Sequence, residues 1–392
     1  MSQDFLLLNL GILKKTYISS KKLLEYWKKV ESELKIVPTE LTYNTTEWQT
    51  VLQFFKQNLF QNEFVEYVSS YMLWKEEIVK VANFLEKAGV VILNWWERTF
   101  PVQLKYCSDP PLFLFTFGNL EYLSTFNKSF AFVGTRNPSL YGRKLARALM
   151  WQSKLAQVCT VSGFATGVDT IVFQESRKYQ NPTVAVLPYL PDTFPFHRKD
   201  SKTLFISEYF APQAVNAKWM YVERNRIIAA LTIATIIIEA PPRSGALITA
   251  DFAYSYNRFV YYLAQSVESV SGAGGLLHSI INNEGRVIRS LYDVLNDLDE
   301  EHSKMFTAQF ENYFMKQINK YIKVNKFLKK QNDLRLVLKS RDIKHNLWRW
   351  CGKNLKLFQN VVIELKRLDM IHEYKGLILI NFLYSPSSWQ KI

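Results

Sequence analysis

The chain has 392 residues, of which 48% are hydrophobic and 21% charged, and its formal net charge is +14. This composition excludes a disordered or fibrous chain, and the length suffices for two or three domains of about 100 to 200 residues each. Cys107, Cys159 and Cys351 form no CxxC pair, which excludes a disulfide framework and favours a reducing cytoplasm. The most apolar stretch, residues 231–240, is well short of the ~20 residues that span a bilayer, and no signal peptide is recognisable, so we expect a soluble cytoplasmic protein.

The positive charge is concentrated near the C-terminus. Residues 302–392 hold eighteen Lys or Arg against six Asp or Glu, a net charge of +12, which leaves +2 on the first 301 residues. A basic tail beside a nearly neutral body indicates an anionic polymer or surface as a partner, with a merely solubilising tail as the alternative.

Residues 1–87 are predicted to form a helical domain. Apolar residues recur there at helical spacing, and the helical pattern extends to about residue 100. The polar faces of these helices show no recognisable chemistry. The pair Pro110-Pro111 marks a break before the strands of the central region.

Residues 88–295 are predicted to form an α/β domain with an extended Rossmann-like parallel sheet. Short β-branched runs alternate there with helical stretches, which is typical of a parallel sheet buried on both faces. Right-handed crossovers place the carboxyl ends of the strands at one edge, where open α/β sheets bind ligands. The predicted strands are residues 130–133, 160–161, 184–187, 204–206, 235–238 and 259–262.

Residues 302–392 are predicted to form a basic helical region with a winged-helix-like domain. Two helices, 343–351 and 355–368, are followed by a hairpin over 371–380, an order typical of a small winged helix. This domain either contacts duplex DNA through basic residues of its second helix or serves dimer or partner contacts. A basic stripe precedes it, formed by Lys316, Lys320, Lys323, Lys326 and Lys330.

Two glycine-containing loops follow predicted strands and suit phosphate groups. In Gly134-Thr135-Arg136 the glycine admits a close backbone approach, the threonine offers a hydroxyl, and the guanidinium matches phosphate oxygens in a bidentate fashion. The second loop begins with Ser162 and Gly163 and leads into a helix, whose N-terminal N–H groups favour an anion. The alternative for the second loop is a simple tight turn.

Arg224 and Arg226 lie in a helical segment that precedes the fifth predicted strand. Arginines two residues apart do not share a helix face. We therefore expect one of them to contact a ligand and the other to pair with an acid such as Glu208 or Glu239.

A fourth motif repeats the anion-site pattern. Ser244 and Gly245 follow the strand that ends near residue 239 and start a helix. Four such motifs at successive strand ends are far more specific than any one of them. Chance rarely aligns them with one edge of a sheet.

The motifs stand in the order Gly-Thr-Arg, Ser-Leu-Tyr-Gly, Ser-Gly-x-Ala-x-Gly-x-Asp, Ala-Val-Leu, Ile-Ser-Glu-Tyr, Arg-Asn-Arg-Ile-Ile-Ala and Ser-Gly-Ala-Leu-Ile-Thr-Ala. Over about residues 88–290 this order resembles the DNA-processing protein A (DprA, or Smf) family. The resemblance implies a cytoplasmic homodimer without enzymatic activity that binds and protects single-stranded DNA and loads the RecA recombinase in natural transformation. It also implies a set of DNA-binding residues: Gly134, Thr135, Arg136, Ser162, Gly163, Arg224, Arg226, Ser244 and Gly245. The chain departs from the family pattern at Phe173, where members usually carry histidine.

The competing interpretation is a nucleotide hydrolase. The fold and the loop at residues 242–245 also resemble the lysine-decarboxylase-like phosphoribohydrolases, and Asp169 or Glu239 would then contact a ribose during N-glycosidic cleavage. This loop lacks the glycine density of their Pro-Gly-Gly-x-Gly-Thr motif, and the histidines form no HxxxH or Cys-His set. We therefore predict a protein without catalytic residues, metal or cofactor. Tyr141 and Tyr209 are candidates for stacking on bases, with buried packing as the alternative.

Overall fold

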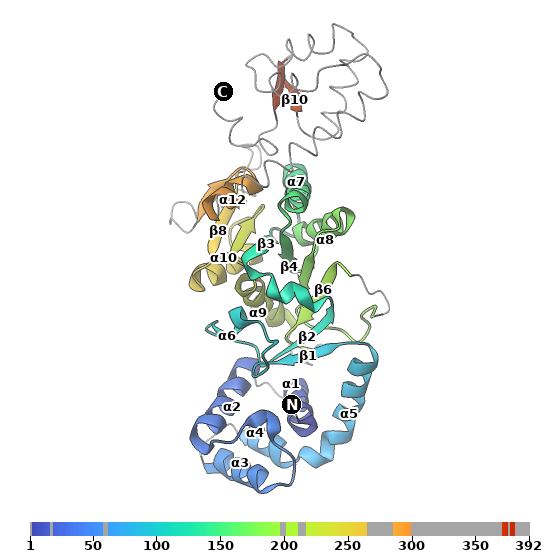
Figure 1. Ribbon diagram of the computed structural model, residues 1–392, viewed down its shortest axis with the longest axis vertical. Helices are drawn as coiled ribbons and strands as arrows, with labels where there is room; N and C mark the ends of the chain where they lie inside the picture. The colour runs from blue at the N-terminus through green and yellow to red at the C-terminus, as the bar shows by residue number, and fades with distance from the viewer. Residues whose placement is uncertain are drawn as a thin grey trace.

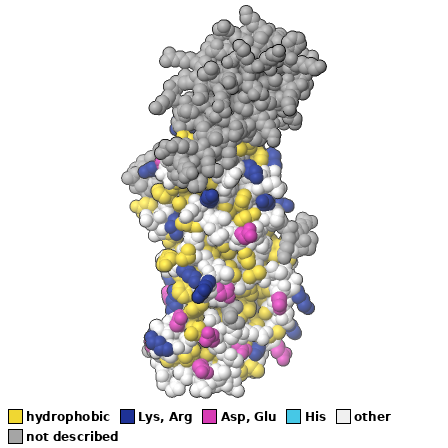
Figure 2. All heavy atoms as spheres, in the orientation of Figure 1, with side chains coloured by type: hydrophobic (Ala, Val, Ile, Leu, Met, Phe, Trp, Pro, Cys, Tyr) yellow, Lys and Arg dark blue, Asp and Glu magenta, His cyan; other side chains and the backbone are white. Residues whose placement is uncertain are grey.

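The computed structural model describes residues 2–15, 19–57, 62–196, 201–210, 217–264, 285–298, 371–374 and 377–380. A group of helices comes first, and a large mixed sheet with helices on both faces follows it (Figure 1). None of the helices in these ranges is long and apolar enough to cross a membrane. On the face shown in Figure 2, basic and acidic side chains are interspersed over the described part of the surface.

The N-terminal helices enclose a core rich in aromatic side chains. Phe5, Trp27, Trp48 and Phe55 are almost completely buried in it, together with Phe113 from the second strand of the sheet. The helices are therefore anchored to the edge of the sheet by a shared apolar core. Their bounds are α1 Gln3–Lys15, α2 Ser20–Leu34, η1 Pro38–Glu40, α3 Thr46–Gln57, α4 Asn62–Ser69 and α5 Tyr71–Lys87.

The sheet has the strand order β1-β2-β6-β5-β4-β3-β7-β8-β9. From β6 to β9 all neighbours are parallel, whereas β2 is antiparallel to both β1 and β6. The bounds are β1 Val91–Asn94, β2 Phe113–Gly118, β3 Ser129–Val133, β4 Cys159–Ser162, β5 Thr183–Val186, β6 Thr203–Ser207, β7 Ala234–Ile237, β8 Phe259–Leu263 and β9 Arg286–Ile288.

The helices of the sheet divide between its two faces. The chain moves outward from β3 to β6 and then returns to the other side of β3, so right-handed crossovers place α7 and α8 on one face and α9 and α10 on the other. Apolar residues of α9 and α10, such as Ile227, Ile228 and Ala250, share a core with Val133 and Ile237 of the strands. The bounds are α6 Val102–Lys105, η2 Leu120–Ser124, η3 Phe126–Lys128, α7 Leu140–Ala156, α8 Val168–Tyr179, α9 Ala217–Ala230, α10 Gly245–Ser255 and α12 Leu291–Leu298.

The six strands predicted from the sequence are all present, and the mostly parallel Rossmann-like sheet is confirmed. The expectation that the helical pattern extends to about residue 100 is wrong, because Val91–Asn94 forms β1. The helix α5 ends at Lys87, and Gly89, with a φ of 74°, turns the chain in the left-handed region that suits glycine just after a helix. Strands β1 and β2, which were not among the predicted strands, extend the parallel sheet at one edge in the antiparallel sense.

Within the C-terminal region the predicted hairpin is confirmed. Strands β10 Ile371–Tyr374 and β11 Leu377–Ile380 pair in the antiparallel sense, with Ile371 opposite Ile380. The basic stripe at 316–330 and the other elements of the predicted winged helix lie outside the described residues.

Candidate nucleic-acid interface

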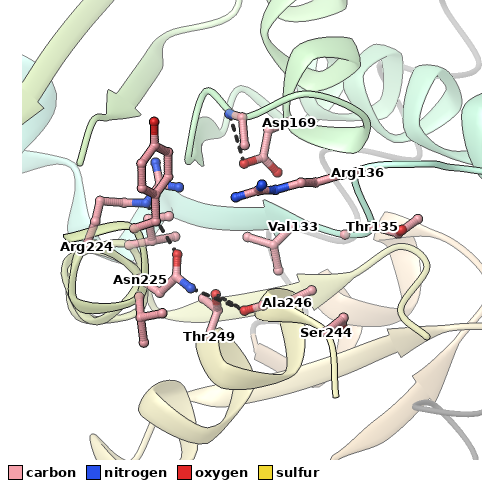
Figure 3. Close-up of a pocket in the computed structure, with 15 residues that line it drawn as sticks. Val133, Thr135, Arg136, Asp169, Arg224, Asn225, Ser244, Ala246 and Thr249 are labelled. Carbon is pink, nitrogen blue, oxygen red and sulfur yellow. Dashed lines mark hydrogen bonds between the residues drawn. The ribbon is translucent and has the colours of Figure 1, made fainter. Parts of the chain in front are cut away.

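The strand order reverses at β3, and a pocket of about 310 Å³ lies at the carboxyl ends of the strands there. This is the crevice in which open α/β sheets bind ligands. We call it the switch-point pocket. Figure 3 shows Arg136 reaching across it toward Arg224 and Asn225 of α9. Its lining is Val133, Gly134, Thr135, Arg136, Ala165, Asp169, Tyr221, Val222, Arg224, Asn225, Ile228, Ser244, Gly245, Ala246 and Thr249.

Arg136 is the exposed cation of this pocket. Its guanidinium carbon lies 5.7 Å from the centre of the Tyr221 ring, a distance at which the ring and the cation attract each other. The side chain is therefore held over the pocket while its N–H groups remain accessible to water. An exposed guanidinium can donate to two phosphate oxygens at once.

Close backbone contacts hold the Gly-Thr-Arg loop in place. The N–H of Thr135 donates to the carbonyl of Glu239 over 2.8 Å, and the N–H of Val168 donates to the carbonyl of Thr135 over 3.1 Å. Gly167 has a φ of 89°, and a Cβ there would lie 2.4 Å from the carbonyl oxygens of Thr135 and Arg136. Only glycine fits at this position, so the two loops fix each other's course.

The N-terminus of α10 forms the floor of the pocket. A Cβ added to Gly245 would meet no atom within 4 Å, so the space beside the first helical turn is open. Ser244 is the N-cap residue, yet its buried Oγ has no hydrogen-bond partner among the described residues. Buried hydroxyls are normally paired, so this orphaned group is suited to a ligand at the helix N-terminus.

Asp169 supplies a buried carboxylate on the opposite wall, in the first turn of α8. It accepts the N–H of Ala165 over 3.3 Å. Burial raises the pKa of this carboxyl, and the positive charge of Arg224 and hydrogen bonds from neighbouring groups oppose that rise.

Arg224 is buried and is largely engaged by the protein itself. Its guanidinium donates to the carbonyls of Gly163 and Val186 and, over 3.3 Å, to the side chain of Asn225. A Cβ on Gly163 would collide with this guanidinium at 2.6 Å. Arg224 thus ties the ends of β4 and β5 to α9, and only part of its side chain lines the pocket.

Arg226 lies outside the pocket lining, in an ion-pair cluster. It is 3% exposed and binds Glu208 at 2.5 Å and Asp109 at 3.2 Å. The expectation that one arginine of the motif pairs with an acid such as Glu208 is confirmed. Glu239, the other acid considered, instead accepts the N–H and hydroxyl of Ser139 at the start of α7.

Glu223 belongs to the same cluster. It accepts the hydroxyl of Tyr209 over 3.2 Å. Burial, and then the negative charge of Glu208, raise the pKa of Glu223 to about 7, although Arg226 partly opposes this. Tyr209 itself is 3% exposed, so its ring is used in packing, which was the alternative to base stacking.

The structure brings together six of the nine predicted site residues. Ser162 and Gly163 are not in the lining: the Ser162 hydroxyl donates to the carbonyl of Phe132 over 2.9 Å, and the carbonyl of Gly163 accepts from Arg224. Arg226 lies in its own cluster. The residues that line the pocket are Gly134, Thr135, Arg136, Arg224, Ser244 and Gly245.

The pocket residues outside the predicted set include Tyr221 and Asn225. With Arg224 and Ile228 they occupy positions i, i+3, i+4 and i+7 of α9, which form one face of a helix. That spacing is visible in the sequence and was the available signal. Among the described residues no group of three His, Cys, Asp or Glu side chains is placed to hold a metal ion.

The family model for DNA recombination-mediator protein A matches residues 91–299. The chain belongs to this family. It is 26% identical over 232 residues to the DNA processing protein DprA of Bacillus subtilis, covering 58% of this chain and 77% of that protein. It is 32% identical over 209 residues to the DprA of Streptococcus pneumoniae, covering 51% and 71%. The resemblance recognised in the sequence motifs is thereby confirmed.

The fold has a counterpart of known structure within this family. The X-ray structure of DNA processing protein A from Streptococcus pneumoniae matches with a TM-score of 0.61 and 24% sequence identity. The match covers 76% of this chain and 99% of that one, so the likeness of fold extends beyond the region that the family model matches.

Proposed function

We propose that the chain is a non-catalytic protein that binds single-stranded DNA through the switch-point pocket. The observation that carries this proposal is the combination of the exposed Arg136, held over Tyr221, with the open N-terminus of α10 at Gly245. A guanidinium and a helix N-terminus on one pocket suit a phosphate group. The relatives named DNA processing proteins support DNA as its source.

The size of the pocket favours a single strand. A volume of about 310 Å³ suits a group of about one nucleotide, and a duplex keeps its bases stacked and paired, so that extruding one costs a few kcal/mol. A single strand presents its bases without that cost. Tyr221 offers an aromatic ring at the pocket wall on which a base can stack.

A nucleotide hydrolase is the second candidate, because Asp169 is a buried carboxyl with a raised pKa in the pocket. A protonated carboxyl is the form that a general acid needs. Against this interpretation, Glu239 accepts two hydrogen bonds from Ser139 at the start of α7. Of the two carboxylates predicted for N-glycosidic cleavage, this leaves Asp169. Release of free base from nucleoside monophosphates, lost in Asp169→Asn, would support the hydrolase and overturn the non-catalytic proposal.

The proposal includes a role in loading RecA onto the bound strand and in protecting that strand during transformation. The family's description as a recombination mediator supports it. A homodimer and a cytoplasmic location, which the family resemblance implies, and duplex DNA contact by the C-terminal domain belong to the same proposal. Strand exchange by RecA on a strand already coated with single-strand binding protein tests the loading role, and sedimentation tests the dimer.

The direct test measures the anisotropy of labelled single-stranded and duplex oligonucleotides at about 50 mM and about 200 mM salt. We expect tighter binding of the single strand at both concentrations and a steep loss of affinity with salt, because binding releases counterions from the phosphates. Equal affinity for both forms would overturn the preference for single strands. Affinity that does not change with salt would overturn phosphate binding.

A further inference from the structure

A second pocket, of about 590 Å³, lies at the opposite edge of the sheet. Pro182 and Lys202 in its lining come directly before β5 and β6, so it borders the amino ends of these strands. We call it the amino-edge pocket. Its lining is Trp151, Ser153, Lys154, Leu155, Gln157, Lys178, Tyr179, Gln180, Asn181, Pro182 and Lys202.

The charge of the amino-edge pocket is positive. Lys154, Lys178 and Lys202 line it, and none of the described residues of its lining is Asp or Glu. Glu175 lies beside Lys178, 2.9 Å from its ammonium group and 3.5 Å from the guanidinium of Arg147, and so faces two cations. The C-termini of α7 and α8 also border the pocket, and each contributes at most about half a negative charge. Three lysines outweigh these two helix ends.

The outer face of α7 connects this pocket with the switch-point pocket. This helix begins four residues after Arg136 and ends in the lining of the amino-edge pocket. Its basic residues are all exposed, and its sequence contains no Asp or Glu. Successive residues of a helix are 100° apart when viewed along its axis, and in this view the basic residues and Trp151 lie within a sector of about 100°. The basic residues are Arg143, Lys144, Arg147 and Lys154.

We propose that α7 and the amino-edge pocket form a second contact for the same DNA strand, which the switch-point pocket binds at its other end. This inference rests on the proposed function. Basic side chains in a row with aromatic rings beside them are what a single strand requires, and Trp151 and Tyr179 supply the rings.

The spacing of the two pockets sets the length of strand that reaches both. The helix α7 has 17 residues and so is about 25 Å long. At about 3.4 Å per nucleotide, the spacing of a strand whose bases stay stacked, about seven or eight nucleotides cover that distance. An oligonucleotide of about four nucleotides therefore reaches one pocket, and one of about twelve reaches both.

The test uses the full chain and oligothymidylates of these two lengths. For the longer oligonucleotide, we expect Lys144→Gln/Lys154→Gln to lower the slope of log affinity against log salt concentration by about 1.4. Each lost phosphate contact with a single strand lowers this slope by about 0.7. Binding of the shorter oligonucleotide stays as in the wild type. The double variant Lys144→Arg/Lys154→Arg, which keeps the charge, retains the slope of the wild type.

The matched control is Lys80→Gln/Lys87→Gln, which removes two exposed lysines from α5. An equal loss in this control, or no change in the slope of the α7 variant, overturns the second contact while the proposed function stands. If Arg136→Ala leaves the binding of both oligonucleotides unchanged, or the wild type binds neither, the proposed function itself fails. The second contact then fails with it.

Discussion

Arg136 and Arg226 are both motif arginines of the same domain, yet the structure gives them opposite surroundings. Arg136 is exposed over an open pocket, whereas Arg226 is buried between Glu208 and Asp109. A buried guanidinium must be neutralised where it lies, and its partners then occupy the N–H groups that a ligand would need. The comparison teaches that burial separates the arginine that can bind phosphate from the arginine that holds the scaffold.

The largest effect should follow from removing the buried arginine. We expect Arg226→Met to lower the free energy of unfolding by about 3–5 kcal/mol, because Glu208 and Asp109 lose a buried counter-charge. Urea denaturation followed by circular dichroism measures this loss. The double variant Glu208→Gln/Arg226→Met should recover part of it. A variant that keeps wild-type stability but loses DNA binding would instead place Arg226 among the ligand contacts.

A smaller effect, confined to binding, should follow at the floor of the pocket. Because a Cβ on Gly245 meets open space, Gly245→Ala should change the free energy of unfolding by no more than about 0.5 kcal/mol. The added methyl narrows the approach of a phosphate to α10, and we expect roughly tenfold weaker oligonucleotide binding, about 1.4 kcal/mol. Anisotropy and urea denaturation of the same sample separate the two effects.

Gly167→Ala is the contrasting variant for Gly245→Ala. Its Cβ would collide with two carbonyl oxygens, in a backbone conformation that L side chains rarely adopt. Loss of stability is therefore expected in Gly167→Ala and not in Gly245→Ala. Unchanged oligonucleotide affinity in a folded Gly245→Ala would show that the ligand does not approach the start of α10.

The smallest effect concerns the pH dependence of the scaffold cluster. The pKa of Glu223 is about 7 in the folded chain, against an ordinary value of 4.5. Between these two pH values the folded chain keeps the proton on Glu223, whereas the unfolded chain has released it. Glu223 therefore stabilises the fold below about pH 4.5, and this contribution is lost as the pH rises through about 7. We expect Glu223→Gln to raise the Tm at pH 8 relative to the wild type by more than at pH 5.5. An equal difference at both values would contradict the shifted pKa.

The sequence predicted the parts of the molecule that depend on local pattern. The β-branched runs predicted the six strands, and the glycine-containing loops that follow strands predicted the edge of the sheet where Gly134 and Gly245 line one pocket. It did not decide which of Arg224 and Arg226 pairs with an acid, because this depends on contacts with Glu208 and with Asp109, which reaches Arg226 from a distant part of the chain. It also missed Tyr221 and its contact with Arg136, because that contact joins α9 to the loop after β3.

The antiparallel strands β1 and β2 were missed for a similar reason. β1 has four residues and follows a long helix whose apolar spacing runs up to it. Their pairing with β6 is decided by contacts across the sheet. Local propensity carries little information on such contacts.

The salt dependence of single-strand binding by the wild type and by Arg136→Ala tests the central claim most directly. If Arg136 contacts a phosphate, its removal lowers the slope of log affinity against log salt by about 0.7, the value for one contact with a single strand. The exposed position of the side chain predicts that the variant keeps the stability of the wild type. An Arg136→Ala variant with the wild-type slope and affinity would contradict the account.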